Sequence, residues 1–224
     1  MVSQRGRATQ LWAFLIALFV IWSIRATIGY RIDESIGSPV ARAAYSVTLK
    51  FLIWVVPAAA FVSLARSTPA VRYLGIAVWP GRVEWLNCIG VTVVFLFLVT
   101  IGETAAGHKT LSLTRLSSLP VSLWLLQLVV SPFLEEVLFR GFVMTECMAL
   151  MPKGRAMAVT SLLFTAIHLP FWLSHGGMNP ATFVNSAGVF FFSLVACWLQ
   201  TRTGSIWPPT LAHIANNIVS SMLL

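Results

Sequence analysis

Residues 121–150 decide the fold of this chain, and they read VSLWLLQLVVSPFLEEVLFRGFVMTECMAL. Apolar side chains dominate this stretch over more than the roughly 20 residues that a helix needs to cross a bilayer core. Glu135, Glu136 and Arg140 nevertheless lie in its middle. Three ionised side chains there would cost roughly 8 to 10 kcal/mol if none were paired or hydrated. The stretch therefore predicts a membrane helix that carries a polar site.

The composition indicates that the whole chain is an integral membrane protein. Hydrophobic residues make up 58% of the 224 residues and charged residues only 10%, which no soluble globular surface would show. Seven apolar stretches follow one another along the chain. We predict an all-α, polytopic membrane bundle of about seven transmembrane helices, or eight if the long fourth stretch is divided. The stretches are 11–28, 43–65, 85–101, 121–150, 156–173, 181–200 and 207–224.

The chain shows no sign of separate domains. It contains no internal repeat, no low-complexity tract and no long linker. We therefore expect a single integral membrane domain over residues 1–224, with a motif-bearing core at about 121–224. Cys88, Cys147 and Cys197 lie far apart without CxxC spacing, so we interpret them as core residues.

The net charge of +8 is explained by membrane topology and not by nucleic-acid binding. The basic residues are scattered through short loops and do not gather on one face, so no nucleic-acid partner is expected. With a cytoplasmic N-terminus, the inner loops carry the excess of Arg and Lys that the positive-inside rule requires. We expect a multi-pass protein of a bacterial inner (plasma) membrane. The predicted inner set is Arg5, Arg7, Arg66, Arg72, Arg82, Lys153, Arg155 and Arg202, and the outer set is Arg25, Arg31, Arg42, Lys109 and Arg115.

The charged cluster in 121–150 has helical spacing. Glu136 and Arg140 are four residues apart with the acid first, the favoured order for an ion pair on one helix face. Glu135 is turned about 100° away, so we expect it to lack a dedicated cation. Such a carboxylate can act as a general base. The alternative interpretation is a buried ion pair that only joins helices.

Two later helices carry polar side chains with the same four-residue spacing. Phe164 and His168 share one helix face, and His213 and Asn217 project together from the last helix. A neutral imidazole can hold a water, take a proton or bind a metal. Imidazole and amide N–H groups can also donate hydrogen bonds to a developing oxyanion. Polar packing between helices is the alternative interpretation.

In this order, EExxxR, FxxxH and HxxxN resemble the motifs of the CPBP family of intramembrane endopeptidases. This family is also called the CAAX-protease and bacteriocin-processing (Abi) family, and it includes the Ras-converting CAAX prenyl protease. The motifs span residues 135–217, roughly the C-terminal half of the chain. The resemblance implies hydrolysis of a peptide bond in a membrane-associated or lipid-modified protein or peptide, with a CAAX-like or C-terminally anchored tail.

The resemblance also implies a role for each motif residue. Glu135 and His168 would position and deprotonate the attacking water. His213 and Asn217 would face the oxyanion of the tetrahedral intermediate. The supporting residues would be Glu136, Arg140 and Phe164. Two mechanisms stay open, a metal-free glutamate protease, which we prefer, and a zinc enzyme with Glu135, His168 and His213 as ligands.

Two other classes of membrane protein also bury Glu, Arg and His. A proton-coupled transporter would favour an inverted repeat or discontinuous helices, and the sequence shows no such repeat. A noncatalytic membrane scaffold or immunity-type protein could use the same fold without chemistry. A catalytically dead relative would normally have lost a motif residue, and none is lost here.

Overall fold

The computed structural model describes residues 3–105, 110, 112, 120–177 and 179–223, and this part of the chain is helical, with no strand. The predicted all-α membrane bundle is therefore confirmed. Lys109 and Arg115 of the predicted outer set lie outside the described residues. Among the described residues, six helical segments are long and apolar enough to cross a membrane. They are Gln4–Ser35, Pro39–Ala65, Arg82–Ala105, Val121–Met148, Lys153–His175 and Thr182–Thr203.

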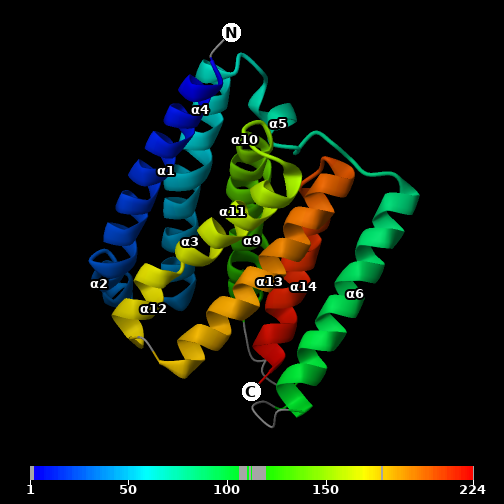
Figure 1. Cartoon of the computed structure of the whole chain (residues 1–224). Helices are drawn as coiled ribbons and strands as arrows, with labels where there is room; N and C mark the ends of the chain where they lie inside the picture. Colours follow the sequence, from blue (N-terminus) through cyan, green and yellow to red (C-terminus); the bar gives the residue numbers. More distant parts are fainter. Residues whose placement is uncertain (1–2, 106–109, 111, 113–119, 178, 224) are drawn as a thin grey trace.

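Each segment is built from one or more elements (Figure 1). The seventh predicted stretch forms a shorter helix of 16 residues, α14. The N-terminal elements are α1 (Gln4–Thr27), α2 (Tyr30–Ser35), α3 (Pro39–Lys50), η1 (Phe51–Val55), α4 (Val56–Ala65), α5 (Ala70–Tyr73) and α6 (Arg82–Ala105). The C-terminal elements are α8 (Val121–Leu123), η2 (Trp124–Val130), α9 (Ser131–Glu136), η3 (Val137–Val143), α10 (Met144–Met148), α11 (Lys153–Ala166), α12 (Leu169–His175), α13 (Pro180–Thr203) and α14 (Trp207–Met222).

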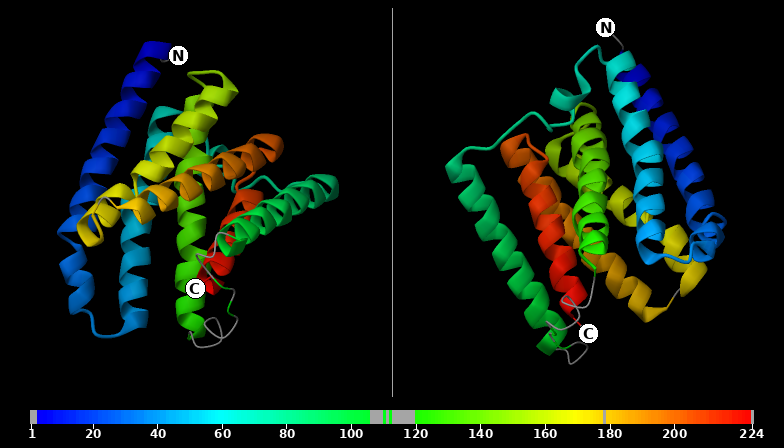
Figure 2. Two further views of the ribbon diagram at one scale, coloured as in Figure 1. Left: turned by 60° about the horizontal axis from the view of Figure 1, so that its bottom comes forward. Right: turned by 180° about the vertical axis from the view of Figure 1, so that it is seen from behind.

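The segment Val121–Met148 is the central helix of the bundle (Figures 1 and 2). Of its most apolar window, 44% is buried, whereas the next most buried segment reaches 33%. The segment is not divided at Pro132, because it continues as a π-helix on both sides of α9. The wider π turns change the hydrogen-bond register near a residue that has no N–H to donate. Glu135 and Glu136 therefore lie in the middle of the bundle.

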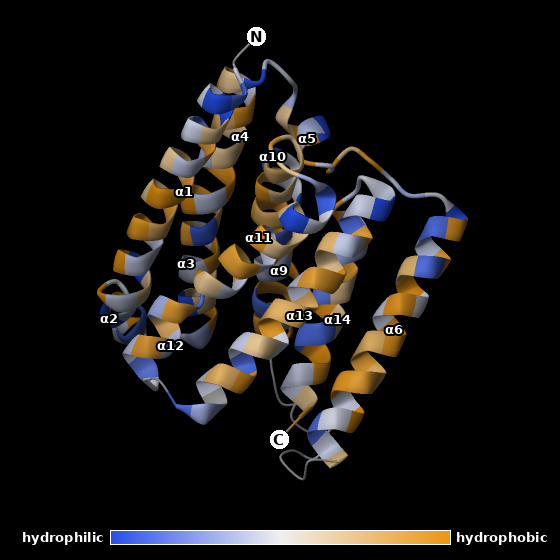
Figure 3. Ribbon diagram, in the orientation of Figure 1, coloured by the Kyte–Doolittle hydropathy of each residue, from blue (hydrophilic) through white to orange (hydrophobic). Residues whose placement is uncertain are grey.

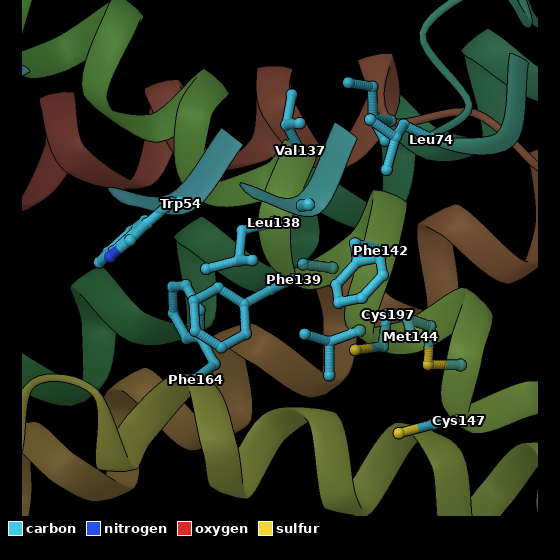
Figure 4. Close-up of a cluster of buried hydrophobic side chains, with 14 of the residues drawn as sticks. Trp54, Leu74, Val137, Leu138, Phe139, Phe142, Met144, Cys147, Phe164 and Cys197 are labelled. Carbon is cyan, nitrogen blue, oxygen red and sulfur yellow. The ribbon is translucent and has the colours of Figure 1, made fainter. Parts of the chain in front are cut away.

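Aromatic rings join the N-terminal half of the chain to this central helix. Phe142 lies edge-on to Phe14 of α1 and to Phe61 of α4, with ring centroids 4.8 and 5.2 Å apart. Trp54 of η1 meets Phe139 at 6.1 Å. Figure 4 shows Trp54 and Phe139 within the same group of buried side chains. The two halves of the chain therefore share one hydrophobic core.

The outer helices present apolar side chains where a soluble protein would present polar ones. The helix α6 stands at the edge of the bundle beside α14 (Figures 1 and 2), and only 11% of its window is buried. Leu86 and Phe97 on α6 are more than 60% exposed. Figure 3 shows hydrophobic residues along most of this helix. These surfaces match the acyl chains of a bilayer.

A buried carboxylate joins the C-terminal end of the central helix to the N-terminal half of the chain. Glu146 of α10 is fully buried and forms ion pairs with Arg7 and Arg66, at 2.9 and 2.8 Å. Tyr73 donates a hydrogen bond to the same carboxylate at 2.5 Å. Burial and this hydrogen bond raise the pKa of Tyr73, so the phenol stays a donor. The sequence analysis assigned no role to Glu146, because its partners are remote in the chain.

The three cysteines are core residues, as predicted. Cys88, Cys147 and Cys197 are all buried and form no disulfide. Cys147 and Cys197 belong to the group of buried side chains drawn in Figure 4. They contribute packing and not cross-links.

The close approach of α5 to the central helix requires a glycine at position 141. A Cβ atom placed on Gly141 would lie 2.7 Å from the carbonyl oxygen of Leu74 and 3.2 Å from its Cβ. We expect Gly141→Ala to lower the free energy of unfolding by about 1 to 3 kcal/mol, because backbone has to move to relieve this overlap. Thermal unfolding in detergent measures the change.

The matched control is Gly90→Ala in the interior of α6, where an added Cβ meets nothing within 4 Å. Alanine is preferred over glycine inside a helix by about 0.5 to 1 kcal/mol, so this control should be neutral or stabilising. Equal unfolding midpoints for the two variants would contradict the close packing of α5 on η3.

Candidate active site

Residues from all three motifs line one pocket of about 320 Å³. The helix α9 provides Glu135, and α14 provides His213 and Asn217. His168 lies where α11 gives way to α12, at the turn before Pro170. Five of the seven predicted site residues line the pocket, namely Glu135, Phe164, His168, His213 and Asn217. The other two, Glu136 and Arg140, are fully buried.

Glu136 and Arg140 form the ion pair that their spacing predicted. Arg140 Nη1 lies 3.0 Å from Glu136 Oε1, and neither side chain is exposed. The other terminal nitrogen, Nη2, donates to Ser193 Oγ at 2.8 Å, which connects the central helix to α13. The guanidinium also lies over the ring of Phe164, 4.4 Å from its centroid. Arg140 therefore fixes three helices around the pocket.

His213 is oriented by Glu136. Its Nδ1 lies 2.7 Å from Glu136 Oε1, and because a carboxylate only accepts hydrogen bonds, this ring nitrogen is the donor. The remaining nitrogen, Nε2, lies 3.8 Å from Glu135 Oε2. Phe192 packs on the ring at a centroid distance of 4.8 Å. Glu136 thus supports the site through both Arg140 and His213.

His168 is held by its own helix turn. Its Nδ1 lies 2.8 Å from the carbonyl oxygen of Phe164, four residues earlier, to which it donates. This contact leaves Nε2 as the acceptor of the neutral ring. Trp172 stacks on the imidazole, with ring centroids 5.4 Å apart and planes 25° apart. The ring orientation is therefore set before any ligand binds.

Glu135 has a dedicated cation, so the expectation that it lacks one is wrong. Lys50, at the end of α3, places Nζ 2.5 Å from Glu135 Oε1 and 2.6 Å from Ser131 Oγ. The side chains of Lys50 and Glu135 are only 15% and 9% exposed. The motif spacing pointed only to Arg140, because Lys50 is 85 residues away in the chain. The only sequence feature that indicated a role for Lys50 was its position as the one charged residue of the apolar stretch 43–65.

The pocket also contains polar residues that motif reasoning did not single out. Asn185 of α13 and Asn216 of α14 line it, together with Ser220 and Glu103. Asn216 and Asn217 are neighbours on α14, and both reach the pocket. Amide groups can donate to and accept from a peptide backbone. The pocket wall therefore suits a polypeptide ligand.

The described residues do not fit a metal site. In the part of the chain that the structure describes, no three His, Cys, Asp or Glu side chains are grouped closely enough to hold a metal ion. The ammonium of Lys50 lies against Glu135, and Glu136 engages Nδ1 of His213. A dication at the predicted ligands Glu135, His168 and His213 would lie beside the Lys50 charge.

Residues 117–219 match the family model described as Type II CAAX prenyl endopeptidase Rce1-like. This region is similar to the Rce1-like family. The match confirms the resemblance that the three motifs indicated. No curated protein and no solved structure matches this chain. The Rce1-like region contains every predicted site residue, whereas Lys50 lies outside it.

Arg140 makes contacts in the Rce1-like region that lysine cannot reproduce. A lysine has no planar fork to pair with Glu136 while it also bonds to Ser193. We expect Arg140→Lys to lower the free energy of unfolding by about 1.5 to 3 kcal/mol, the contribution of one hydrogen bond to a charged group. Thermal unfolding in detergent measures the loss.

Arg202→Lys, at the exposed end of α13, is the matched control. A surface substitution of this kind changes stability by no more than about 0.5 kcal/mol. If both arginine variants unfolded at the native temperature, the buried guanidinium would not be the support that its contacts indicate.

Proposed function

We propose that this protein is an intramembrane endopeptidase that hydrolyses a peptide bond in a membrane-associated or lipid-modified polypeptide. One observation carries the proposal: Glu135, His168, His213 and Asn217, from three separate helices, line a single pocket. The Rce1-like family implies a protease. The bundle contributes a low-dielectric enclosure in which fixed donors and charges act strongly.

In the proposed reaction, Glu135 is the general base. It takes a proton from a water that also donates to His168 Nε2, and the resulting hydroxide attacks the scissile carbonyl carbon. The C–N bond then breaks as Glu135 returns this proton to the leaving amine. The products are a carboxylic acid and an amine, so water is the only co-reactant. Neither side chain is consumed.

The oxyanion of the tetrahedral intermediate would be held by α14. The amide of Asn217 is a donor, and His213 is a second donor in its imidazolium form, with Nδ1 donating to Glu136. Removal of one oxyanion donor typically lowers kcat by about 10² to 10³.

A second cavity supports a lipid-modified substrate with a CAAX-like or C-terminally anchored tail. It has a volume of about 410 Å³ and is lined by α14, the central helix and the start of α6 with the residue Trp79 before it. Phe133, two residues before Glu135, is part of its wall and stacks with Trp207 at 5.6 Å. Such an apolar space suits a hydrocarbon chain. The remaining lining is formed by Trp79, Trp85, Val129, Val130, Thr210, Leu211 and Ile214.

We further propose that the protein lies in a bacterial inner membrane with its N-terminus in the cytoplasm. The starts of α1, α6 and α11, the helix α5 and the end of α13 lie toward one end of the bundle (Figure 1), and residues of the predicted inner set belong to these segments. The C-terminus, α2 and α12 lie at the other end. Bilayer lipids are then the surroundings of the outer helices.

The substitution Glu135→Gln tests the proposed chemistry, because it removes the base while keeping the size of the side chain. We expect cells with the native chain to contain cleaved protein termini that are absent from cells with this variant. We also expect kcat to fall by at least about 10², the low end for a general base. Mass spectrometry of membrane and secreted protein termini measures the loss and identifies the substrate.

The control is Glu84→Gln at the exposed start of α6, which should leave every terminus unchanged. Identical termini in cells with native and Glu135→Gln protein, both folded and expressed, would contradict the peptidase proposal. That result would favour a noncatalytic scaffold or immunity-type protein, or a proton-coupled transporter.

A chelator tests the metal-free form of this mechanism. We expect EDTA or 1,10-phenanthroline to leave the cleavage rate of the purified protein unchanged, because Lys50 already supplies a cation to Glu135. Loss of cleavage with a chelator, and its recovery with Zn²⁺, would instead support the zinc mechanism with Glu135, His168 and His213 as ligands.

A further inference from the structure

We propose that Lys50 is a positioning residue for Glu135. Together with Ser131 it holds the Oε1 atom of the Glu135 carboxylate, and this leaves Oε2 as the atom that accepts the proton of the attacking water. The inference rests on the proposed peptidase function. It assigns a role in the reaction to a residue of the N-terminal half, outside the Rce1-like region of residues 117–219.

Glu135 Oε1, Lys50 Nζ and Ser131 Oγ form a closed set of three hydrogen-bonded atoms. Lys50 Nζ donates to Glu135 Oε1 at 2.5 Å and to Ser131 Oγ at 2.6 Å. The hydroxyl of Ser131 in turn donates to Oε1 at 3.3 Å. Ser131 lies one turn before Glu135 on α9, so it adds a contact from the same helix face. Oε1 therefore has two donors from two different helices.

Within the described part of the chain, no hydrogen bond reaches the other carboxylate oxygen, Oε2. Among the described residues, the nearest ionic partner of Oε2 is His213 Nε2 at 3.8 Å, which is beyond hydrogen-bond length. Glu135 lines the pocket that also contains His168 and Asn217. The two oxygens of one carboxylate thus have different surroundings, one held by the protein and one available to a ligand.

Lys50 also contacts a buried aromatic ring. Its ammonium lies 5.2 Å from the ring centroid of Trp54, a fully buried residue of η1. Its side chain also lines a separate pocket of about 230 Å³, together with Trp54 and His168. Lys50 therefore contacts both this 230 Å³ pocket and Glu135. Its hydrogen bonds to Glu135 and Ser131 and its contact with the Trp54 ring hold the ammonium in place.

A purely structural role for this ion pair predicts a different outcome from a positioning role. If Lys50 only neutralised Glu135 in the bilayer, its loss would lower stability in the way that breaking any buried pair does. If it positions the base, its loss also changes the rate of the chemical step while substrate binding is preserved. The ratio of the effects on kcat and KM separates the two roles.

The experiment compares Lys50→Met with Lys50→Arg in purified protein. The probe is an internally quenched peptide that ends in a farnesylated CAAX sequence. We expect Lys50→Met to lower kcat by about 10²-fold, the usual effect of a small misplacement of a reacting group, with KM changed by less than about threefold. Lys50→Arg keeps a cation at Oε1 and should retain kcat within about tenfold of the native value.

Arg7→Met is the matched control. Arg7 also pairs a residue of the N-terminal half with a glutamate of the central helix, Glu146, but at the end of that helix that lies away from the pocket. We expect this variant to lose stability without a change in kcat. If Lys50→Met kept the native kcat, or if Arg7→Met lost as much kcat, the positioning role would be overturned.

A second measurement reports on the carboxylate without any substrate. Infrared spectra are recorded for the native, Lys50→Met and Arg7→Met proteins, each with and without Glu135→Gln. The difference between the two spectra of each protein isolates the carboxylate band of Glu135. We expect this band to shift in Lys50→Met and to stay in place in Arg7→Met. An unchanged band in Lys50→Met would overturn the proposal whatever the substrate.

The outcomes also separate this inference from the proposed function. Cleavage of the farnesylated peptide by both native and Glu135→Gln protein would contradict the peptidase mechanism itself. If native protein left the peptide intact, the proposed substrate class would be wrong, and the infrared band would still decide whether Lys50 holds Glu135. A peptidase that loses activity with Glu135→Gln, but not with Lys50→Met, would overturn the positioning role alone.

Discussion

The rest of the site depends on the burial of one carboxylate, that of Glu136, inside a helical bundle of low dielectric. Its Oε1 atom accepts hydrogen bonds from both Arg140 and His213. An ionised group in this place is stable only if donors satisfy it, so loss of either partner would lower the stability of the fold. Through Arg140 the same carboxylate orders Ser193 on α13, and through His213 it orders α14. The pocket wall follows from this arrangement.

The two adjacent glutamates have different surroundings, although their sequence context is almost the same. Glu136 points into the protein, where both of its partners belong to the Rce1-like region. Glu135 points to the pocket and takes its cation, Lys50, from α3. A carboxylate held on one side and open on the other suits a proton-transfer role, whereas a carboxylate enclosed on all sides suits a support role. This difference underlies the division of roles that we propose.

The Rce1-like region does not form the site by itself. Trp54 packs on Phe139 behind the pocket, and Lys50 completes the charge pairing of Glu135. At the other end of the central helix, Arg7 pairs with Glu146. The N-terminal helices therefore provide charges and packing that the motif-bearing helices lack. In a bilayer, where lipid offers no partner for a buried charge, such contacts have to come from neighbouring helices.

The sequence by itself determined the features that depend on short separations along the chain. Apolar length predicted the membrane helices, and the four-residue spacing predicted the Glu136–Arg140 pair, because one helix turn brings such residues together. Only the tertiary structure decided that Lys50 reaches Glu135 from 85 residues away. It also decided that Asn185 shares the pocket. Helix periodicity places side chains on one face of a helix. Which faces meet depends on how whole helices pack, and this cannot be read from local spacing.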